Sequence, residues 1–288
     1  MGKIQTHELS LGSFDMFAIN DYPPLHSYKA SSFFSTAPAD ELQAIFNKRG
    51  LDGDKLLSPF NCLYVDTGST KALIDTGVGV WGGEKAPGSG LVASSLKASG
   101  VNPEEIDIVI LTHAHPDHIG GICLDTGRTP YSRAKFIIHE EEWKFWSDPE
   151  SRGRIGEKHP DFIFFVDRNL IPVEEKLVTV GDDEEIAPGI RMLASKGHTP
   201  GHCCVELTSG QKKLIFLSDA TLHEIHVEHP DWHPKVDMDA SEGESSRLEI
   251  LKRAAAENAI VLGYHFPFPG IGTITKDADG FQFRNVRE

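Results

Sequence analysis

The chain has 288 residues, of which 39% are hydrophobic and 25% charged, as in an ordinary globular protein rather than a disordered or fibrous one. Its formal net charge of −15 repels phosphate backbones and anionic lipid surfaces, so we expect no nucleic acid and no membrane as a partner. No apolar run approaches the length of a membrane span, and the first residues lack the pattern of a secretory signal, so the expected location is the cytoplasm.

The first third of the chain predicts strands and loops with one helix. Apolar runs between turn residues predict strands at Ile4–Leu11, Phe14–Ile19, Cys62–Val65 and Lys71–Ile74. The segment Ala39–Arg49 carries apolar residues at helical spacing and stops before Gly50, which predicts a helix. The turn Thr67-Gly68-Ser69 joins the last two strands into a predicted hairpin, and Asp75-Thr76-Gly77 ends the second of them.

The rest of the chain alternates groups of strands with helices. Further strands are predicted at Ile108–Leu111, Lys135–Ile138, Lys176–Val180, Ile190–Ala194, Cys203–Leu207, Lys213–Leu217 and Ile260–Gly263, and helices at Leu91–Ser99 and Glu244–Asn258. Strands outnumber helices, and the helices fall between groups of strands. This order predicts an α+β fold with two sheets packed face to face and helices outside. We expect one domain over residues 1–288, with an N-terminal extension over about residues 1–60.

A histidine cluster follows directly after the predicted strand Ile108–Leu111. His113 and His115 lie two residues apart at a strand end, so their imidazoles project to the same side and can bind one metal ion. Asp117 and His118 are neighbours on the following turn and cannot easily share that ion, but they can bind a second ion close by. The cluster therefore predicts a metal site that needs further ligands from elsewhere in the chain.

Three later segments offer such ligands. His198 lies in the loop Gly197-His198-Thr199-Pro200-Gly201-His202, Asp219 follows an apolar strand, and His265 ends the sequence Gly263-Tyr264-His265. Each of these residues comes just past the C-terminal end of a predicted strand. One edge of the two sheets is therefore expected to gather all of them.

Together these motifs resemble the metallo-β-lactamase-fold hydrolase superfamily: H-x-H-x-D-H, G-H-T-P-G-H, S-D-A, a late Gly-Tyr-His and the early Asp75-Thr76-Gly77. The resemblance implies a four-layer αββα sandwich, which agrees with the element order. It implies that one divalent ion is held by His113, His115 and His198, that a second is held by Asp117, His118 and His265, and that Asp219 bridges the two. Zinc is the expected ion, with Mn²⁺, Fe²⁺ and Co²⁺ as alternatives.

Two ions so placed would share a water and lower its pKa, which makes a metal-bridging hydroxide the expected nucleophile. Asp117 and Asp219 are the expected catalytic residues, and the resemblance implies that Asp117 also protonates the leaving group. Asp75 and His202 are expected to hold metal ligands by hydrogen bonds, although a plain turn or loop role is the alternative for each.

The branch most similar in pattern contains N-acyl homoserine lactonases and methyl parathion hydrolases. It implies a neutral, fairly apolar small-molecule substrate: a lactone, an aryl ester or a phosphotriester. Lactonases of this branch carry a tyrosine three residues past the bridging aspartate, whereas this chain has Leu222, which is similar to the methyl parathion hydrolase pattern. The candidate pocket residues are Leu222, Trp232, Phe266 and Phe268.

Two other classes of function stay open. One is a nucleic-acid or thioester hydrolase with the same metal site, and the other is a non-catalytic metal-binding protein. The histidine-rich segment His223–His233 is expected to be a solvated loop over the site rather than a third metal site. Members of the branch often pair through N-terminal segments, and the Pro- and Phe-rich stretch Tyr22–Phe34 is compatible with a homodimer.

Overall fold

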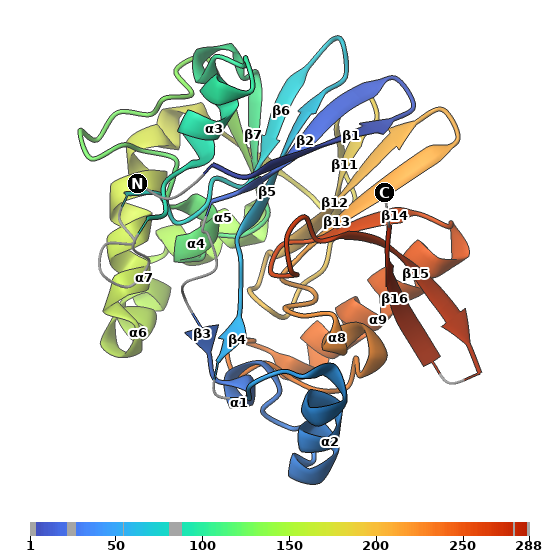
Figure 1. The fold of residues 1–288 in the computed structure, drawn as a ribbon. Coiled ribbons are helices and arrows are strands. Elements are labelled where there is room, and N and C mark those ends of the chain that lie inside the picture. Colours follow the sequence, from blue (N-terminus) through green and yellow to red (C-terminus); the bar gives the residue numbers. More distant parts are fainter. Residues whose placement is uncertain (1–3, 22–26, 54, 81–87, 279, 287–288) are drawn as a thin grey trace.

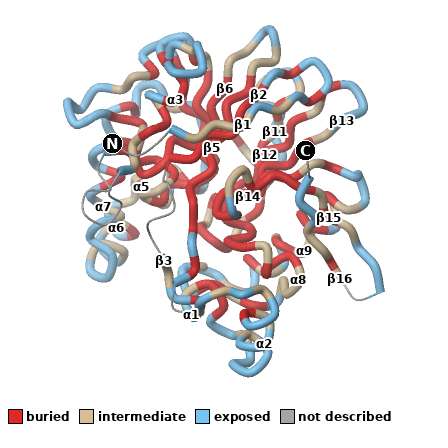
Figure 2. Tube along the Cα trace, viewed as in Figure 1, coloured by how far each residue is buried: buried red, intermediate tan, exposed pale blue. Residues whose placement is uncertain are grey.

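The computed structural model describes residues 4–21, 27–53, 55–80, 88–278 and 280–286. Within these residues two seven-stranded sheets pack face to face, and helices cover their outer sides (Figure 1). The strands are buried where the sheets meet, and exposed residues gather on the outer helices and turns (Figure 2). The predicted four-layer αββα sandwich is therefore confirmed.

The first sheet has the order β1-β2-β5-β6-β7-β8-β9. Its strands are β1 (Thr6–Leu11), β2 (Phe14–Asn20), β5 (Asn61–Asp66), β6 (Lys71–Ile74), β7 (Ile108–Leu111), β8 (Lys135–His139) and β9 (Leu177–Val180). From β6 to β9 all neighbours pair in parallel, so these strands end at the same edge of the sheet.

The second sheet has the order β10-β11-β12-β13-β14-β15-β16. Its strands are β10 (Glu185–Ala187), β11 (Ile190–Ala194), β12 (Cys203–Ser209), β13 (Lys212–Ser218), β14 (Ile260–Gly263), β15 (Ile271–Asp277) and β16 (Gly280–Asn285). Here β13 and β14 pair in parallel and end together. The backbone N–H of Cys203 donates to the carbonyl of Thr112 (3.0 Å), which joins the two sheets at the edge where β7 ends.

Helices cover the two outer faces. They are α3 (Val92–Ala98), η2 (Pro103–Glu105), α4 (Pro116–Ile119), α5 (Glu140–Ser147), α6 (Pro149–Lys158), α7 (Pro160–Phe165), η3 (Val166–Leu170), η4 (Ile171–Lys176), α8 (Ile225–Glu228) and α9 (Ala240–Ala256). The apolar side of α9, with Leu251 and Ala254, packs on Ile215 and Val261 of the second sheet. In the part of the chain described, no helix has both the length and the apolar character that crossing a bilayer requires.

Residues 27–57 form a separate layer, which we call the N-terminal arm. It contains β3 (Ser27–Tyr28), α1 (Ala30–Phe33), α2 (Ala39–Arg49) and β4 (Leu56–Leu57), and it lies against α8 (Figure 1). Its core side chains, such as Phe34 and Phe46, cluster with Leu222 and Trp232. Since β1 and β2 belong to the first sheet, the part outside the sandwich is shorter than the extension expected over about residues 1–60.

Most predicted elements occur, and the largest difference lies between β8 and β9. The helix Ala39–Arg49 and the strands Lys71–Ile74 and Ile108–Leu111 have the predicted bounds, and the first strand of the hairpin extends one residue past the predicted Cys62–Val65 at each end. Helix α9 begins four residues before the predicted Glu244 because Asp239 caps it. No element was predicted over 140–175, where α5 to η4 follow one another. The hairpin β15–β16 was also missed.

Asp21 joins the end of β2 to the loop that precedes α3. Its carboxylate is fully buried and accepts hydrogen bonds from five backbone N–H groups, those of Val78, Gly79, Gly90, Leu91 and Val92, at 2.6 to 3.4 Å. Burial raises the pKa of this carboxyl, and the hydrogen bonds from Leu91 and Gly90 oppose that shift. Asp21 therefore supplies hydrogen-bond acceptors for backbone N–H groups that do not pair with any strand in the described residues.

We predict that Asp21→Asn lowers the free energy of unfolding by about 2–4 kcal/mol. The amide NH₂ of asparagine would face backbone N–H groups, and two donors cannot form a hydrogen bond with each other. Chemical denaturation measures this change. Asp15→Asn, at an exposed position of the same strand, is the control and should change stability by less than about 0.5 kcal/mol. Equal losses in the two variants would contradict the role given to Asp21.

Candidate metal centre

The predicted ligands lie where strands of both sheets end. His113 and His115 follow β7, Asp219 follows β13, and His265 follows β14. His115 caps the short helix α4, and Pro116 occupies its first position, so Asp117 and His118 lie in the first turn. These side chains form two groups, one of four residues and one of three. Within each group all the ligand atoms lie within 4.8 Å of one another.

The first group consists of His113, His115, His198 and Asp219, all buried. Nε2 of His198 lies 3.0 Å from Nδ1 of His115 and 3.1 Å from Oδ2 of Asp219. Nε2 of His113 lies 3.8 Å from the same Asp219 oxygen. Three imidazoles and one carboxylate oxygen thus converge, which is a donor set that suits zinc.

The second group consists of Asp117, His118 and His265. Nε2 of His265 lies 3.5 Å from Oδ2 of Asp117 and 3.4 Å from Oδ1 of Asp219. Nε2 of His118 lies 3.2 Å from that Asp219 oxygen. The two carboxylate oxygens of Asp219 therefore face different groups, Oδ2 the first and Oδ1 the second, which is the arrangement that a bridging ligand requires.

Unpaired buried atoms test whether these residues fit metal ions. Nε2 of His113, Nε2 of His118 and Oδ1 of Asp219 are buried and have no hydrogen-bond partner within the described residues. A buried polar atom without a partner costs about 1–3 kcal/mol, so several of them in one place need compensation. Two divalent ions would provide it, since each of these atoms points into a group that offers further donors.

Hydrogen bonds on the far side of two imidazoles of the second group fix which nitrogen faces the centre. Nδ1 of His118 donates to Oδ2 of Asp75 (2.8 Å), and Nδ1 of His265 donates to the carbonyl of Pro59 (3.1 Å). The carboxylate of Asp75 also accepts from the backbone and hydroxyl of Thr112 (2.9 and 2.8 Å). In the neutral form of each ring, Nε2 then carries no proton and is available to an ion.

His202 acts on Asp219 rather than on a metal. Its Nδ1 donates to the carbonyl of Ser195 (2.7 Å), and its Nε2 accepts from the backbone N–H of Asp219 (3.1 Å). Burial and repulsion from His198 lower the pKa of His202 to about 3, so the ring is neutral, as these two bonds require. Both ring nitrogens are used, and His202 holds the backbone from which the bridging carboxylate projects.

The charges around Asp219 favour its ionised form. Burial opposes ionisation, but attraction to His118, His265 and His198 outweighs it and holds the pKa of this carboxyl well below its usual range. Burial raises the pKa of Asp75, and attraction to His118 opposes that shift. Asp219 is therefore an anion in this environment, as a metal-bridging ligand must be.

Glycines let the ligand loops approach other backbone segments directly. A Cβ on Gly120 would lie 2.2 Å from the carbonyl oxygen of Val78, and a Cβ on Gly121 would lie 2.0 Å from that of Thr76. The hydroxyl and N–H of Thr76 both donate to the carbonyl of His118 (2.8 Å each). The Asp75-Thr76-Gly77 turn thus holds both the ring and the backbone of His118.

Glu142 of α5 was missed by sequence reasoning. Its carboxylate is fully buried and joins the two loops of the first group. Oε1 accepts from the backbone of Ala114 (2.9 Å) and from the indole of Trp146 (2.7 Å), while Oε2 accepts from the hydroxyl of Thr199 and the backbone of Gly201 (2.7 and 2.9 Å). Glu142 is the last of three consecutive glutamates, and only its spacing to Trp146 marks it as the buried one.

Other supporting residues were also missed. Nδ1 of His198 donates to Oδ1 of Asp237 (2.8 Å), and the hydroxyl of Ser218 donates to that of Thr112 (2.8 Å). The hydroxyl of Tyr264 donates to the carbonyl of Asp117, and its ring stacks on His118 with centroids 4.0 Å apart. Sequence position could have indicated three of these residues, because each directly precedes a predicted ligand: Thr112, Ser218 and Tyr264. Asp237 lies among other acidic residues, and nothing in the sequence distinguishes it from them.

The candidate pocket residues do not gather around the metal ligands. Phe266 is fully buried and packs on Phe283 with ring centroids 5.1 Å apart, so it is a core residue and its assignment to the pocket wall is corrected. Leu222 and Trp232 are 3% exposed and belong to the cluster under the N-terminal arm, while Phe268 is half-buried against the main core. Two aromatic rings lie beside the first group within the described residues: that of Phe162 in α7, 4.8 Å from the ring of His115, and that of Trp146, at 6.1 Å.

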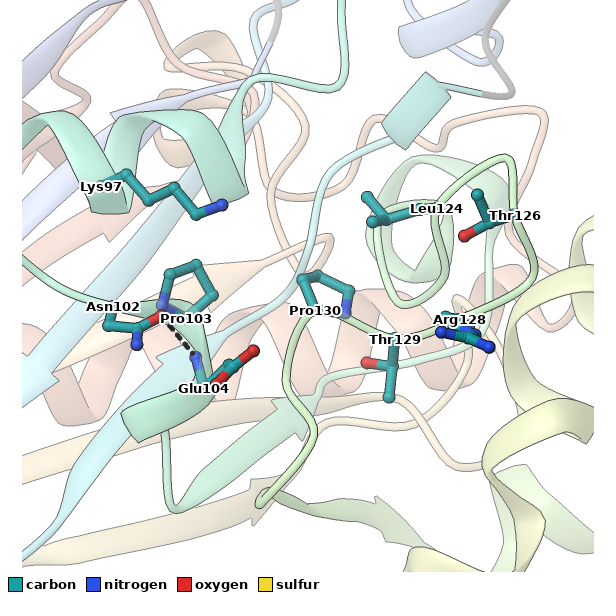
Figure 3. A pocket seen from close by; sticks show the side chains of 9 residues that line it. All are labelled: Lys97, Asn102, Pro103, Glu104, Leu124, Thr126, Arg128, Thr129 and Pro130. Carbon is teal, nitrogen blue, oxygen red and sulfur yellow. Dashed lines mark hydrogen bonds between the residues drawn. The ribbon is translucent and has the colours of Figure 1, made fainter.

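A surface cavity of about 590 Å³ lies elsewhere in the fold. It is lined by residues from the end of α3, from η2 and from the loop before β8, with Lys97 and Arg128 on opposite sides (Figure 3). It contains none of the residues of the two metal-ligand groups. The cavity therefore does not serve as the substrate site of this centre.

The histidine-rich segment His223–His233 is not the solvated loop that was expected. It forms α8, and both His223 and His226 are buried. Nε2 of His226 donates to the carbonyl of Phe33 (2.9 Å), because the N-terminal arm packs over this segment. Within the described residues these histidines join neither group of metal-ligand side chains. The part of Tyr22–Phe34 at 22–26 lies outside the described residues.

Comparison with known proteins places this geometry in a family. Residues 58–265 match the family profile described as the metallo-beta-lactamase superfamily. An N-acyl homoserine lactonase from Bacillus cereus is 24% identical over 230 residues, which cover 74% of this chain and 83% of that relative. A second such lactonase, from a Bacillus species, is 25% identical, and the match spans 65% of it.

Two solved structures share the whole fold. AidC, a dizinc quorum-quenching lactonase in complex with a product, superposes with a TM-score of 0.87 and 26% identity over 99% of this chain and 98% of that one. The hydrolase AbOPH of the beta-lactamase superfamily has a TM-score of 0.90 and 24% identity over 100% of this chain and 99% of that one. The similarity to AbOPH shows a shared fold and nothing further.

We predict that Glu142→Gln weakens metal binding and lowers the free energy of unfolding by about 1–3 kcal/mol, because the amide NH₂ would face backbone or indole N–H donors. Thermal unfolding with and without zinc measures both effects. Glu140→Gln, at an exposed position two residues earlier on the same helix, is the control and should behave as the wild type. Unchanged zinc-dependent stabilisation in Glu142→Gln would contradict this role.

Proposed function

Because this chain belongs to the metallo-β-lactamase superfamily, we propose that it is a hydrolase that uses two divalent ions to cleave a neutral, ester-type bond. The observation that carries the proposal is the position of Asp219, whose two oxygens face two separate groups of imidazoles. A site for one structural ion would need neither the second group nor a shared carboxylate. Zinc is the proposed ion, since histidine nitrogens dominate both groups.

When bound, the ions would supply an activated water and a Lewis-acidic partner for the substrate oxygen. The chain's own residues hold that chemistry in place: His202 fixes the backbone of Asp219, and Asp75 fixes the ring of His118. Asp117 is the most accessible of the acidic ligands, with a side chain 23% exposed against 5% for Asp219. We assign to Asp117 the transfer of a proton to the leaving group, because its carboxylate can reach both the centre and a bound substrate.

The proposed substrates are small, neutral and partly apolar. The half-buried ring of Phe162 offers an apolar surface beside the first group, and a net charge of −15 disfavours polyanions. The relatives named as N-acyl homoserine lactonases make acyl lactones the first class to test. Leu222 is buried against the N-terminal arm and carries no hydroxyl, so a lactone carbonyl would find no tyrosine there. Aryl esters and phosphotriesters therefore stay within the proposal.

We predict that removing metal with a chelator abolishes hydrolysis and that Zn²⁺ restores it. Asp219→Ala should lower the affinity for both ions by more than about 100-fold, because losing a shared ligand costs more than losing an outer hydrogen-bond partner. Metal content after dialysis and the rate of hydrolysis measure these effects. Asp125→Ala, in an exposed loop, is the control. Full activity in metal-free protein, or two retained ions in Asp219→Ala, would overturn the dinuclear mechanism.

We predict that protein loaded with zinc, manganese or cobalt hydrolyses at least one class among acyl homoserine lactones, paraoxon-type triesters and aryl esters. A thioester and a single-stranded RNA serve as comparison substrates. Turnover of a neutral ester with a kcat/KM at least about 100-fold above that for RNA is the expected result, because the acidic chain repels polyphosphate. Cleavage of RNA alone would support the nucleic-acid alternative, and no turnover with two bound ions would support a non-catalytic metal protein.

A further inference from the structure

Arg247 of α9 is a buried arginine, and two of its three hydrogen bonds lead towards the candidate metal ligands. Its side chain is 1% exposed. Nε donates to the carbonyl of Ala220 (2.7 Å), Nη1 to the carbonyl of Pro230 (2.7 Å), and Nη2 to Oδ2 of Asp237 (3.2 Å). Ala220 follows Asp219 directly. The guanidinium thus fixes the backbone just past the bridging carboxylate.

Asp237 carries this contact to the first group. Its side chain is 1% exposed, and its second oxygen, Oδ1, accepts the hydrogen bond from Nδ1 of His198 (2.8 Å). The backbone adds to the contact, since the N–H of Met238 donates to the carbonyl of His198 (3.2 Å) and that of Asp239 to the carbonyl of Gly197 (2.8 Å). The ring and the backbone of His198 are therefore both held by the segment 237–239.

Close packing leaves this arrangement little freedom. Gly197 has a φ of +116°, and a Cβ there would lie 2.0 Å from the backbone nitrogen of Gly243 in α9. Taking an arginine and an aspartate out of water is costly unless each charge is paired and fully hydrogen-bonded. Arg247 and Asp237 are paired with each other, and every nitrogen and oxygen atom of the two charged groups takes part in a hydrogen bond. Arg247 also bonds to the residue after Asp219, and Asp237 also bonds to His198.

The carboxylates behind the two groups differ in their partners. Asp75, behind His118, is bonded by Thr112 and His118, which carry no permanent charge. Asp237, behind His198, is bonded by the cationic Arg247. A carboxylate shared with a guanidinium draws less strongly on the imidazole proton. The two groups therefore receive unequal support from the protein.

We propose that Arg247 and Asp237 are positioning residues that set how tightly the group His113–His115–His198 holds its ion, and that they act on this group more strongly than on the group Asp117–His118–His265, because His198 belongs to the first group alone. This inference rests on the proposed function, in which each group holds one ion. The pair acts by fixing the direction of Nε2 of His198 and the backbone that follows Asp219. It does not touch the reacting atoms.

The test is a competitive zinc titration against a chromophoric chelator. His113→Ala and His265→Ala identify which binding step belongs to which group. Asp237→Ala should weaken the step of the first group by about 10–100-fold, as expected for an outer partner of a ligating histidine, and should weaken the other step much less. Asp237→Asn keeps an acceptor for His198 and should fall between Asp237→Ala and the wild type. A variant that had merely lost stability would weaken both steps equally.

Arg247→Met alone would leave Asp237 buried without its partner and risks failing to fold. The double variant Asp237→Asn, Arg247→Met removes both charges and should weaken the first step more than Asp237→Asn does, because the hydrogen bond to Ala220 is lost as well. Arg253→Met breaks another α9 ion pair, with Glu206 (2.8 Å), and is the matched control for the helix. The Co²⁺ absorption spectrum of the first site should change in Asp237→Ala and not in Arg253→Met.

The outcomes separate the two proposals. Fewer than two ions bound by the wild-type protein would defeat the proposed function itself. Two ions bound by the wild type, with wild-type affinity at both steps in Asp237→Ala, would defeat the role of Asp237 and Arg247 alone. Equal weakening of both steps in Asp237→Ala would also defeat it, because the effect would then not belong to one group.

Discussion

The structure depends on how one carboxylate is held between two sets of imidazoles. Asp219 can serve both sets only if its backbone and its χ angles are fixed, and neighbours on each side supply that restraint. His202 accepts from its backbone N–H, and Arg247 donates to the carbonyl of the next residue. The surrounding fold brings β7, β13 and β14 to one edge so that this carboxylate meets histidines from both sheets.

Three of the ligand histidines are supported in the same way. Their outer nitrogen, Nδ1, is bonded to a fixed acceptor, which is Asp75 for His118, Asp237 for His198 and Pro59 for His265. These acceptors come from parts of the chain that are distant in sequence. The centre is therefore a property of the folded sandwich, and no short peptide from this chain would reproduce it.

The sequence predicted the two sheets, and the seven candidate metal ligands that it indicated lie together in the two groups, because strand ends and histidine spacing are local patterns. It did not predict α5 to α7, since α6 carries one large apolar residue, Ile155, and so lacks an amphipathic repeat. Nor could it distinguish buried acids such as Glu142 and Asp237 from the many acids at the surface. The misassigned Phe266 has the same origin, because proximity to His265 in sequence did not decide which way the ring points.

The N-terminal arm is connected both to the α8 segment and to the candidate metal ligand His265. It receives the hydrogen bond of His226 and pairs with residues 233–235, and the chain that leaves it at Leu57 reaches Ser58 and Pro59, which contact His265. The arm and one of the candidate metal ligands are therefore connected by two residues of the chain. A substitution that displaces the arm would also displace Ser58 and Pro59, the partners that orient the ring of His265.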